Sequence, residues 1–352
     1  MLRDTLLSGD TPRGKALSII LALILVALAL APFLFTGTKP LTVAAKICIF
    51  VVLVVSYDLL LGYTGIVSFA HTMFYGIGGY GVGLALYSWG PTWGIVLAGT
   101  VIALVASLAL ALAIGLFSLR VKAIFFAMIT LAVASAFAVL ASQLSWLTGG
   151  EDGRTFRVPE ILRPGFTLFE VGDVKFTGRF ISYYIVFFGA ALLFFTVLRI
   201  VNSPFGRVLQ AIRENGFRAE ALGYRTVYYR TGAVVLSALV ATLAGCLNAL
   251  WLRYTGPDTT LSFNIMMDIL LMCVIGGMGT VYGALIGATL FVLAQNYLQA
   301  LMGSASEAMA GLPILPVLFH PDRWLLWLGI LFVASVYFFP SGIVGRLRKG
   351  EG

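Results

Sequence analysis

The sequence predicts an all-α polytopic membrane protein, and three observations carry that prediction. Sixty per cent of the 352 residues are apolar and only 11% are charged, so the composition differs from that of an ordinary soluble domain. The apolar residues form continuous runs, most of them about 18 residues or longer, which is the length that crosses a bilayer as a helix. These runs do not alternate at period two, which argues against an outer-membrane barrel.

We expect about ten transmembrane helices, some of them broken or rich in glycine. The eighth apolar run is the shortest, and Gly276-Gly277-Met278-Gly279 follows it directly, so the boundaries within 263–283 stay open. The predicted spans are Leu17–Phe35, Leu41–Leu61, Ile66–Tyr87, Trp93–Leu119, Ala123–Leu147, Phe180–Ile200, Thr231–Leu252, Phe263–Ile275, Tyr282–Met302 and Trp324–Phe339.

Lysine and arginine gather in connections that an even number of spans places on one side of the membrane. The positive-inside rule makes that side cytoplasmic. The loop 148–179 then lies outside, and its five basic and five acidic residues balance. The predicted organisation is a cytoplasmic segment 1–16, a transmembrane domain 17–340 with the cytoplasmic loop 202–230, and a cytoplasmic tail 341–352.

Patterns typical of catalysis, metal binding or nucleotide binding are scarce. The three cysteines lie inside apolar spans without metal-ligand spacing, and His71 and His320 are the only histidines. Gly9 to Lys15 fits the first seven positions of a phosphate-binding loop, but Ala16 stands where a magnesium-ligating hydroxyl must be. We therefore expect no enzyme, no metal and no cofactor on this chain. The net charge of +8 fits basic loops facing anionic lipid and does not indicate nucleic-acid binding.

The loop 202–230 carries the signals of two short amphipathic helices. Ser203 is a suitable N-cap and Pro204 suits the first helical position. Asn215-Gly216 breaks this helix, and a second helix over Phe217–Leu222 ends at Gly223. An apolar face on such a basic segment predicts a docking surface; it consists of Phe205, Val208, Leu209 and Ile212.

Charged side chains inside apolar spans are costly and are candidates for function. Lys46 lies near the start of its span, where it can extend to the interface. Asp58 and Asp268 lie deeper, and each precedes a similar short phrase that ends in glycine, which hints at two related halves. For both aspartates, capping or pairing within the bundle and a direct role in transport remain open.

Glycine clusters follow both aspartates and predict broken or tightly packed helices. Small residues four apart allow close helix contact, and breaks in corresponding positions of a transporter often mark its pathway. Both interpretations stay open for these glycines. The candidate pathway residues are Asp58, Tyr63, Thr64, Gly65, Ser68, His71, Gly276, Gly277, Gly279 and Thr280.

Several phrases together resemble one family closely. They are Asp58 to His71 (DLLLGYTGIVSFAH), Thr148 to Gly153 (TGGEDG), Ser203 to Asn215 (SPFGRVLQAIREN), Ala219 to Gly223 (AEALG) and Gly276 to Thr280 (GGMGT). Their order and spacing are similar to those of permease subunits of branched-chain amino acid (Liv-type) ABC importers, and specifically to the longer of the two permease types. The resemblance covers the chain from about Leu41 to Met302.

That resemblance implies a multi-pass protein of a bacterial inner membrane with both termini cytoplasmic. It implies a second permease subunit in a heterodimer, two cytoplasmic ATPase subunits that bind ATP and Mg, and a periplasmic solute-binding protein. Ala219 to Gly223 is similar to the loop by which ABC permeases contact their ATPases, although the fuller motif is not kept after Gly223. The implied coupling residues are Arg213, Glu214, Ala219, Glu220, Ala221, Leu222 and Gly223.

The resemblance leaves the cargo open. It implies branched-chain or other hydrophobic amino acids, while related permeases carry urea, short amides, or aromatic and carboxylic acids. An ion-coupled secondary transporter would also explain broken helices and repeats, but it would not need the segment 202–230.

Overall fold

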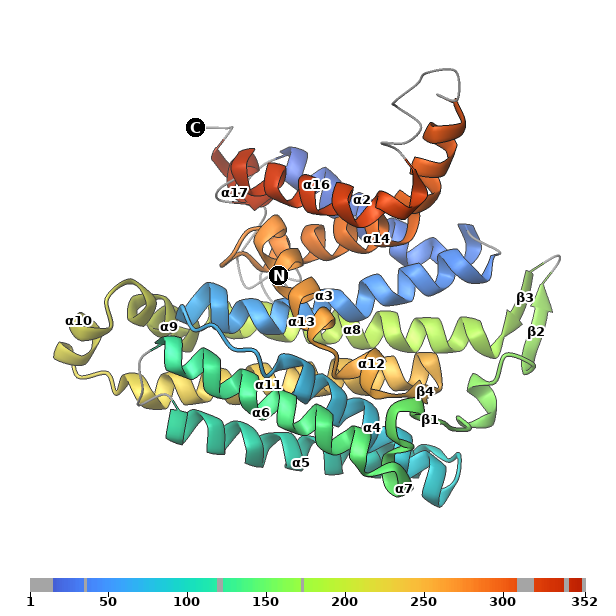
Figure 1. The fold of residues 1–352 in the computed structure, drawn as a ribbon, viewed down its shortest axis with the longest axis horizontal. Coiled ribbons are helices and arrows are strands. Elements are labelled where there is room, and N and C mark those ends of the chain that lie inside the picture. Colours follow the sequence, from blue (N-terminus) through green and yellow to red (C-terminus); the bar gives the residue numbers. More distant parts are fainter. Residues whose placement is uncertain are drawn as a thin grey trace.

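The chain folds as a helical bundle in the computed structural model, which describes residues 15–34, 37–118, 123–171, 174–308, 320–338 and 342–349. The long helices run roughly parallel and antiparallel to one direction (Figure 1). They are α2 (Lys15–Leu34), α3 (Thr38–Thr64), α4 (His71–Trp89), α5 (Trp93–Ser118), α6 (Ala123–Gln143), α8 (Gly178–Asn202), α11 (Thr226–Leu252), α13 (Phe263–Gly276), α14 (Val281–Ala308) and α16 (Trp324–Phe338).

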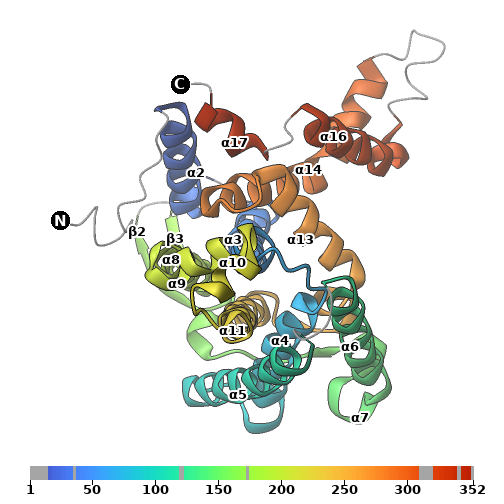
Figure 2. The same ribbon diagram turned by 90° about the vertical axis from the view of Figure 1, so that its left-hand side faces the viewer.

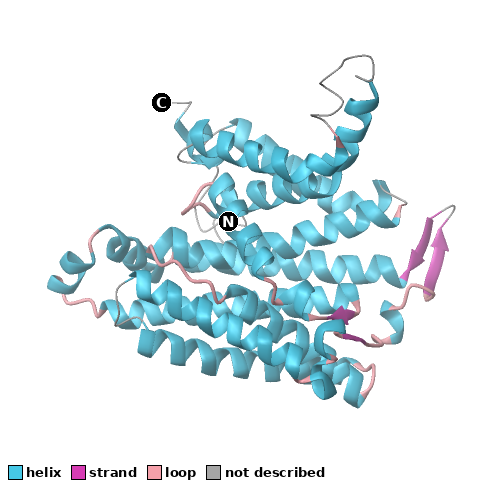
Figure 3. Cartoon of the chain, viewed as in Figure 1, coloured by secondary structure: helices cyan, strands magenta, loops and turns pink. Residues whose placement is uncertain are grey.

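Short elements occupy the two ends of the bundle. One end, called here the α10 end, carries α9 (Pro204–Glu214), α10 (Gly216–Ala221) and α17 (Gly342–Lys349). The opposite end, called the hairpin end, carries the β2–β3 hairpin, and all strands are short (Figure 3). The elements between α6 and α8 are α7 (Ser145–Thr148), η1 (Gly150–Asp152), β1 (Arg154–Thr155), η2 (Glu160–Leu162), β2 (Thr167–Val171) and β3 (Val174–Thr177); those after α11 are β4 (Tyr254–Thr255), α12 (Pro257–Thr260) and η3 (Pro321–Arg323).

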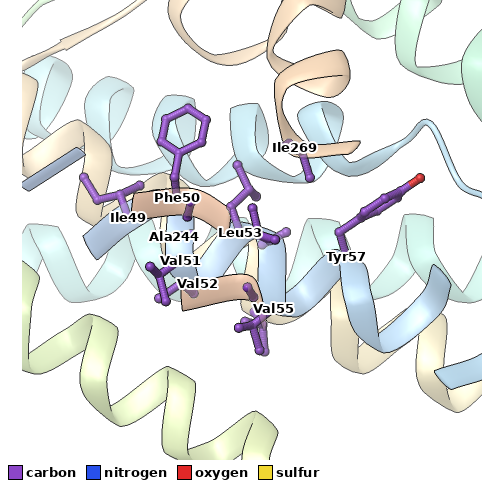
Figure 4. Packing of buried hydrophobic residues seen from close by; sticks show 14 of the residues in the cluster. Ile49, Phe50, Val51, Val52, Leu53, Val55, Tyr57, Ala244 and Ile269 are labelled. Atoms are coloured by element: carbon purple, nitrogen blue, oxygen red, sulfur yellow. The ribbon is translucent and has the colours of Figure 1, made fainter. Parts of the chain in front are cut away.

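Helix α3 is the centre of the bundle. It contacts α8, α11, α13 and α14, and nearly all its residues from Val43 to Leu60 are buried. Its side chains are mostly Val, Ile and Leu and are apolar on every face, which is the pattern of a helix surrounded by others. Figure 4 shows Ile49 to Tyr57 packed with Ala244 of α11 and Ile269 of α13.

Close backbone approach joins α4 to α11. A Cβ added to Gly78 would collide with the carbonyl of Thr242, and one added to Gly245 would collide with the carbonyl of Tyr75. The two helices therefore touch through their backbones, and α5 packs against both (Figure 2). This is the small-residue packing that lets membrane helices gain dispersion contact in the absence of a hydrophobic driving force.

All ten predicted spans contain a helix, so the predicted fold is confirmed. Eight of the described helices are long and apolar enough to cross a membrane. Helix α4 falls outside that group because it holds five glycines and polar residues, which its burial under neighbouring helices permits. Helix α16 falls outside it because its described part has only 15 residues.

Two predicted spans extend beyond the helices that they contain. The third span was expected to begin at Ile66, but residues 65–70 are not helical and α4 begins at His71, because Gly65 ends α3 in the left-handed conformation. The fifth span was expected to reach Leu147, but α6 ends at Gln143 and the short α7 follows. The predicted segment 1–16 lies almost wholly outside the described residues.

The contact between α4 and α11 yields a stability prediction. Gly78→Val should lower the temperature at which the protein in detergent loses its monodisperse elution peak, because the added carbons must displace α11, at a cost of about 1–3 kcal/mol. Gly94→Val is the matched control, since a Cβ at Gly94 meets nothing within 4 Å. Equal melting of the two variants would contradict the close packing.

Candidate functional site

Helix α9 begins and ends as the sequence predicts. The Ser203 side chain caps it by accepting from the Gly206 amide, and Pro204 occupies its first turn. Asn215 ends α9 and caps α10 by accepting from the Arg218 amide. Of the predicted apolar face, Leu209 and Ile212 are fully buried. The packing of α9 against α3, α8 and α11 shows that this face is used inside the chain.

The exposed apolar side chains lie instead on α10 and just after it. Phe217 is 84% exposed and Leu222 is 73% exposed, and Tyr224 and Tyr228, which follow in the sequence, are also exposed. We call these four residues the α10 patch. Phe217, Tyr224 and Tyr228 were not among the predicted coupling residues. Their aromatic character in a polar loop was the signal available in the sequence.

Some of the other predicted coupling residues make contacts within the chain, and the others are exposed. The carboxylate of Glu220 accepts a hydrogen bond from the Thr226 hydroxyl, which ties α10 to the first residue of α11. Ala219 is buried, while Glu214 and Ala221 are exposed. Gly223 has φ +92°, so it ends the turn in a conformation that favours glycine.

Arg213 connects α9 to the end of α3. Its guanidinium donates to the carbonyl of Gly62, and its aliphatic stem lies against Gly65. The Gly62 carbonyl is in the last turn of α3, where helix carbonyls lack partners from their own helix. Arg213 therefore fills an open acceptor with a cation, which the helix dipole also favours at that position.

Asp58 joins the same junction from within α3. Its Oδ1 accepts from the Gly279 amide at 2.8 Å and from the Cys273 thiol at 3.4 Å. Gly62 must lack a side chain here, because a Cβ would collide with the Asp58 carboxylate and the Gly279 nitrogen. The structure thus brings Asp58, Gly62, Gly279 and Arg213 together, and Asp58 caps the connection between α13 and α14.

His71 belongs to a separate buried cluster. Its Nε2 lies 2.8 Å from the hydroxyl of Ser237 on α11, and that hydroxyl donates to the carbonyl of Ser56 on α3. The ring also packs edge-on against Tyr57, with centroids 4.9 Å apart. His71 therefore links α3, α4 and α11, and is 1% exposed in this chain.

The remaining candidate pathway residues lie near the Asp58 junction or in the segment before His71. Tyr63, Thr64 and Ser68 are buried, and the Ser68 hydroxyl accepts from the Ala70 amide in the non-helical segment 65–70. That segment gains a second partner from α6, where the Thr130 hydroxyl accepts from the Phe69 amide. Gly65 is exposed, and the turn at Gly276, Gly277 and Thr280 lies beside Gly279.

Asp268 is linked through Gln295 to Lys46, which is distant in the sequence. Gln295 of α14 donates to its Oδ2 at 3.2 Å and accepts from the ammonium of Lys46 at 2.8 Å. Lys46 and Asp268 are thus joined across α3, α14 and α13 by one amide, so both charges are partnered within the bundle. For both Asp58 and Asp268 the structure shows capping or pairing; a role in transport stays untested.

The hairpin end also has a defined contact. β1 pairs antiparallel with β4, with Arg154 opposite Thr255. The Arg154 guanidinium donates to the carbonyl of Trp146 and lies 4.4 Å from the centre of the Tyr87 ring. This pairing fastens the segment after α6 to the end of α11. No group of three potential metal ligands occurs among the described residues.

Comparison with known proteins assigns the chain to a family. The family described as "Branched-chain amino acid transport system / permease component" matches residues 39–336. The chain belongs to this family. It is therefore a multi-pass membrane permease and a subunit of a transport complex, and its family is one of non-enzymatic transport subunits.

Curated relatives match the permease over 35% to 91% of its length. It is 25% identical over 341 residues to the high-affinity branched-chain amino acid transport permease protein LivM of Salmonella typhimurium, covering 91% of this chain and 76% of the relative. It is 25% identical over 229 residues to the probable LivM of Methanocaldococcus jannaschii, covering 64% and 61%. It is 32% identical over 130 residues to the autoinducer 2 import permease LsrC of Yersinia pseudotuberculosis, covering 35% and 36%. No solved structure matches the permease significantly.

The Asp58 cap yields a second prediction. Asp58→Ala should destabilise the permease by about 1–3 kcal/mol because it leaves the half-buried Gly279 amide without its acceptor on the buried α3. Asp58→Asn keeps an acceptor oxygen and should lose less. Melting of the two variants in detergent measures the difference. An Asn variant that melts with the Ala variant would show that the charge, and not the hydrogen bond to Gly279, is what matters.

Proposed function

We propose that this permease forms half of the translocation path of an ATP-driven importer and receives its ATPase at the α10 patch. The observation that carries the proposal is the α10 patch itself, four large apolar or aromatic side chains exposed in a loop between two membrane helices. Its exposed position beside the tightly packed α9 favours a protein partner. ATP and Mg would be bound by that partner.

The contacts of α9 and α10 support a rigid transmission from this surface. Glu220 ties α10 to α11, and Arg213 ties α9 to the end of α3. Asp58 continues the link from α3 to the turn between α13 and α14. A displacement of the α10 patch by a closing ATPase dimer would therefore move α3, α11, α13 and α14 together, in the manner of a rigid-body switch.

The arrangement of the two ends supports an orientation. The basic loop 202–230 lies at the α10 end, and the charge-balanced loop 148–179 lies at the hairpin end (Figure 1). By the positive-inside rule the α10 end faces the cytoplasm, in a bacterial inner membrane, with both chain termini on that side. A second permease subunit would complete the path, and a periplasmic solute-binding protein would dock at the hairpin end.

For the cargo we propose branched-chain or other hydrophobic amino acids. The family description and the LivM relatives support this cargo, and they cover far more of the chain than the LsrC match does. No lysine or arginine is among the described buried residues of the spans, and the half-buried Lys46 donates to Gln295. A zwitterion that passes without tight binding suits such a path.

The first test addresses coupling. In the reconstituted complex, the double variant Phe217→Ser, Leu222→Ser should abolish substrate-stimulated ATP hydrolysis and weaken association with the ATPase. The reason is that the two most exposed side chains of the α10 patch are lost. Ile161→Ser removes an exposed apolar side chain at the hairpin end and should leave ATPase association unchanged. Normal association of the double variant would move the docking surface elsewhere.

The second test addresses cargo. ATP hydrolysis by the wild-type complex should rise when leucine is supplied through the binding protein, and should stay at the basal rate with urea or a short aromatic acid. Stimulation by one of the latter would keep the importer and replace its cargo. A solute uptake that depends on an ion gradient and not on ATP would instead support a secondary transporter.

A further inference from the structure

An apolar cavity of about 480 Å³ lies between α2 and the rest of the bundle. Its lining comes from four helices: α2, α3, α8 and α14. None of the described side chains that line it carries a charge. The polar groups are limited to the hydroxyls of Ser18 and Tyr282 and the thiol of Cys48. The cavity plays no part in the coupling contacts described above.

Helix α2 is anchored to α8 near its C-terminal end. Pro32 has no amide hydrogen, so the Leu28 carbonyl lacks its usual partner four residues on. The Tyr183 hydroxyl of α8 donates to that carbonyl at 2.6 Å, and the Tyr184 hydroxyl donates to the next one, Ala29, at 3.0 Å. Phe33 packs against Phe180 in the same region. These contacts anchor the C-terminal part of α2 to α8.

From this anchor the cavity extends toward the start of α2. The residues of α2 that line it run from Leu28 back to Ser18, which is about 15 Å along a helix at 1.5 Å per residue. Tyr282, the second residue of α14, lies at its other wall and belongs to the α10 end. The cavity therefore reaches from the α10 end to about the middle of the span, between the C-terminal anchor of α2 and its buried first turn at Leu17.

The apolar lining of the cavity favours a hydrocarbon chain as its occupant. An apolar cavity of only about 150 Å³ stays dry and takes up apolar ligands, so water is a poor occupant here. An unfilled space would lose the dispersion contacts of its walls. The outer face of α2 is apolar and exposed, as Leu23 and Val26 show, so the bilayer is the adjacent source of hydrocarbon. Lipid chains can enter beside this helix.

The sequence near the cavity favours an anionic headgroup. Helix α17 contacts α2, α13 and α14 at the α10 end. Its sequence carries Arg346, Arg348 and Lys349, and basic residues next to a membrane helix attract anionic lipid by about 1 kcal/mol each. We propose that the cavity binds one acyl chain of an anionic phospholipid from the leaflet at the α10 end, wedged between α2 and the bundle.

Photolabelling of the assembled complex tests this proposal. The complex is placed in nanodiscs that contain traces of phosphatidylglycerol with a diazirine on its acyl chain, and the adducts are located by peptide mass spectrometry. We expect enriched adducts on peptides holding Leu21–Leu25 of α2 and Ala190–Phe194 of α8. A phosphatidylcholine probe should label the same peptides less, and an equal yield would remove the headgroup preference from the proposal.

Filled variants provide the decisive comparison. Ala190→Phe and, separately, Ala22→Trp place an aromatic ring in the cavity and should remove most of the enriched labelling. Leu192→Trp is the matched control, because Leu192 is on α8, is 68% exposed and does not line the cavity. The melting temperature of each variant shows whether it is folded; Ala22 is exposed on α2, so its variant tolerates the change best.

Three results would overturn the proposal. Labelling spread evenly over the exposed faces of α5 and α16 would indicate ordinary surrounding lipid. Labelling unchanged by either filled variant would place the lipid elsewhere. Cross-links between α2 and a helix of another subunit would show that a protein fills the cavity. Because lipid labelling needs neither ATP nor cargo, its failure would leave the proposed transport function unaffected.

Discussion

The bilayer core offers no hydrogen-bond partner, so every backbone group within the spans must find one inside the protein. This constraint accounts for three long-range polar contacts of the permease. Where α3 ends, Arg213 fills the open carbonyl of Gly62. Where α13 gives way to α14, Asp58 takes the free amide of Gly279. Where Pro32 leaves a carbonyl free in α2, Tyr183 supplies the donor.

The same constraint makes the junction at the α10 end both polar and rigid. A break in a membrane helix is tolerated only where protein surrounds it, so the two breaks after α3 and α13 lie against each other. The side chains that satisfy them come from α3 and α9, which brings the loop 202–230 into direct contact with the membrane spans. The hydrogen bonds that satisfy these backbone groups also tie α9 to the spans, so a movement of α9 would move the spans with it.

Close helix packing also restricts movement between the spans. Backbone contact between α4 and α11 leaves no space for sliding, and α3 is enclosed on every face. Looser packing occurs at the periphery, where α2 is anchored through Tyr183 and Tyr184 near one end and an apolar cavity lies between it and α3, α8 and α14. Such a gap in an apolar medium is stable only when hydrocarbon fills it, so the lipid becomes part of the structure.

The sequence by itself determined the class of fold, the ten apolar runs that contain the helical spans, and the two short helices of the loop 202–230. These are encoded locally, by apolar runs, by Ser203 as a cap, by the break at Asn215-Gly216 and by Gly223 as an end. It also marked Asp58 and Asp268 as costly charges, because a carboxylate in an apolar run stands out whatever surrounds it.

Only the tertiary structure decided what those residues contact. Asp58 and Gly279 are 221 positions apart, and Lys46 and Gln295 are 249 apart, so no local pattern could join them. It likewise showed that the apolar face of α9 is buried within the chain while Phe217 and Leu222 of the α10 patch are exposed. An amphipathic helix has one apolar face in any setting, and the neighbours that cover that face are set by the packing of distant segments.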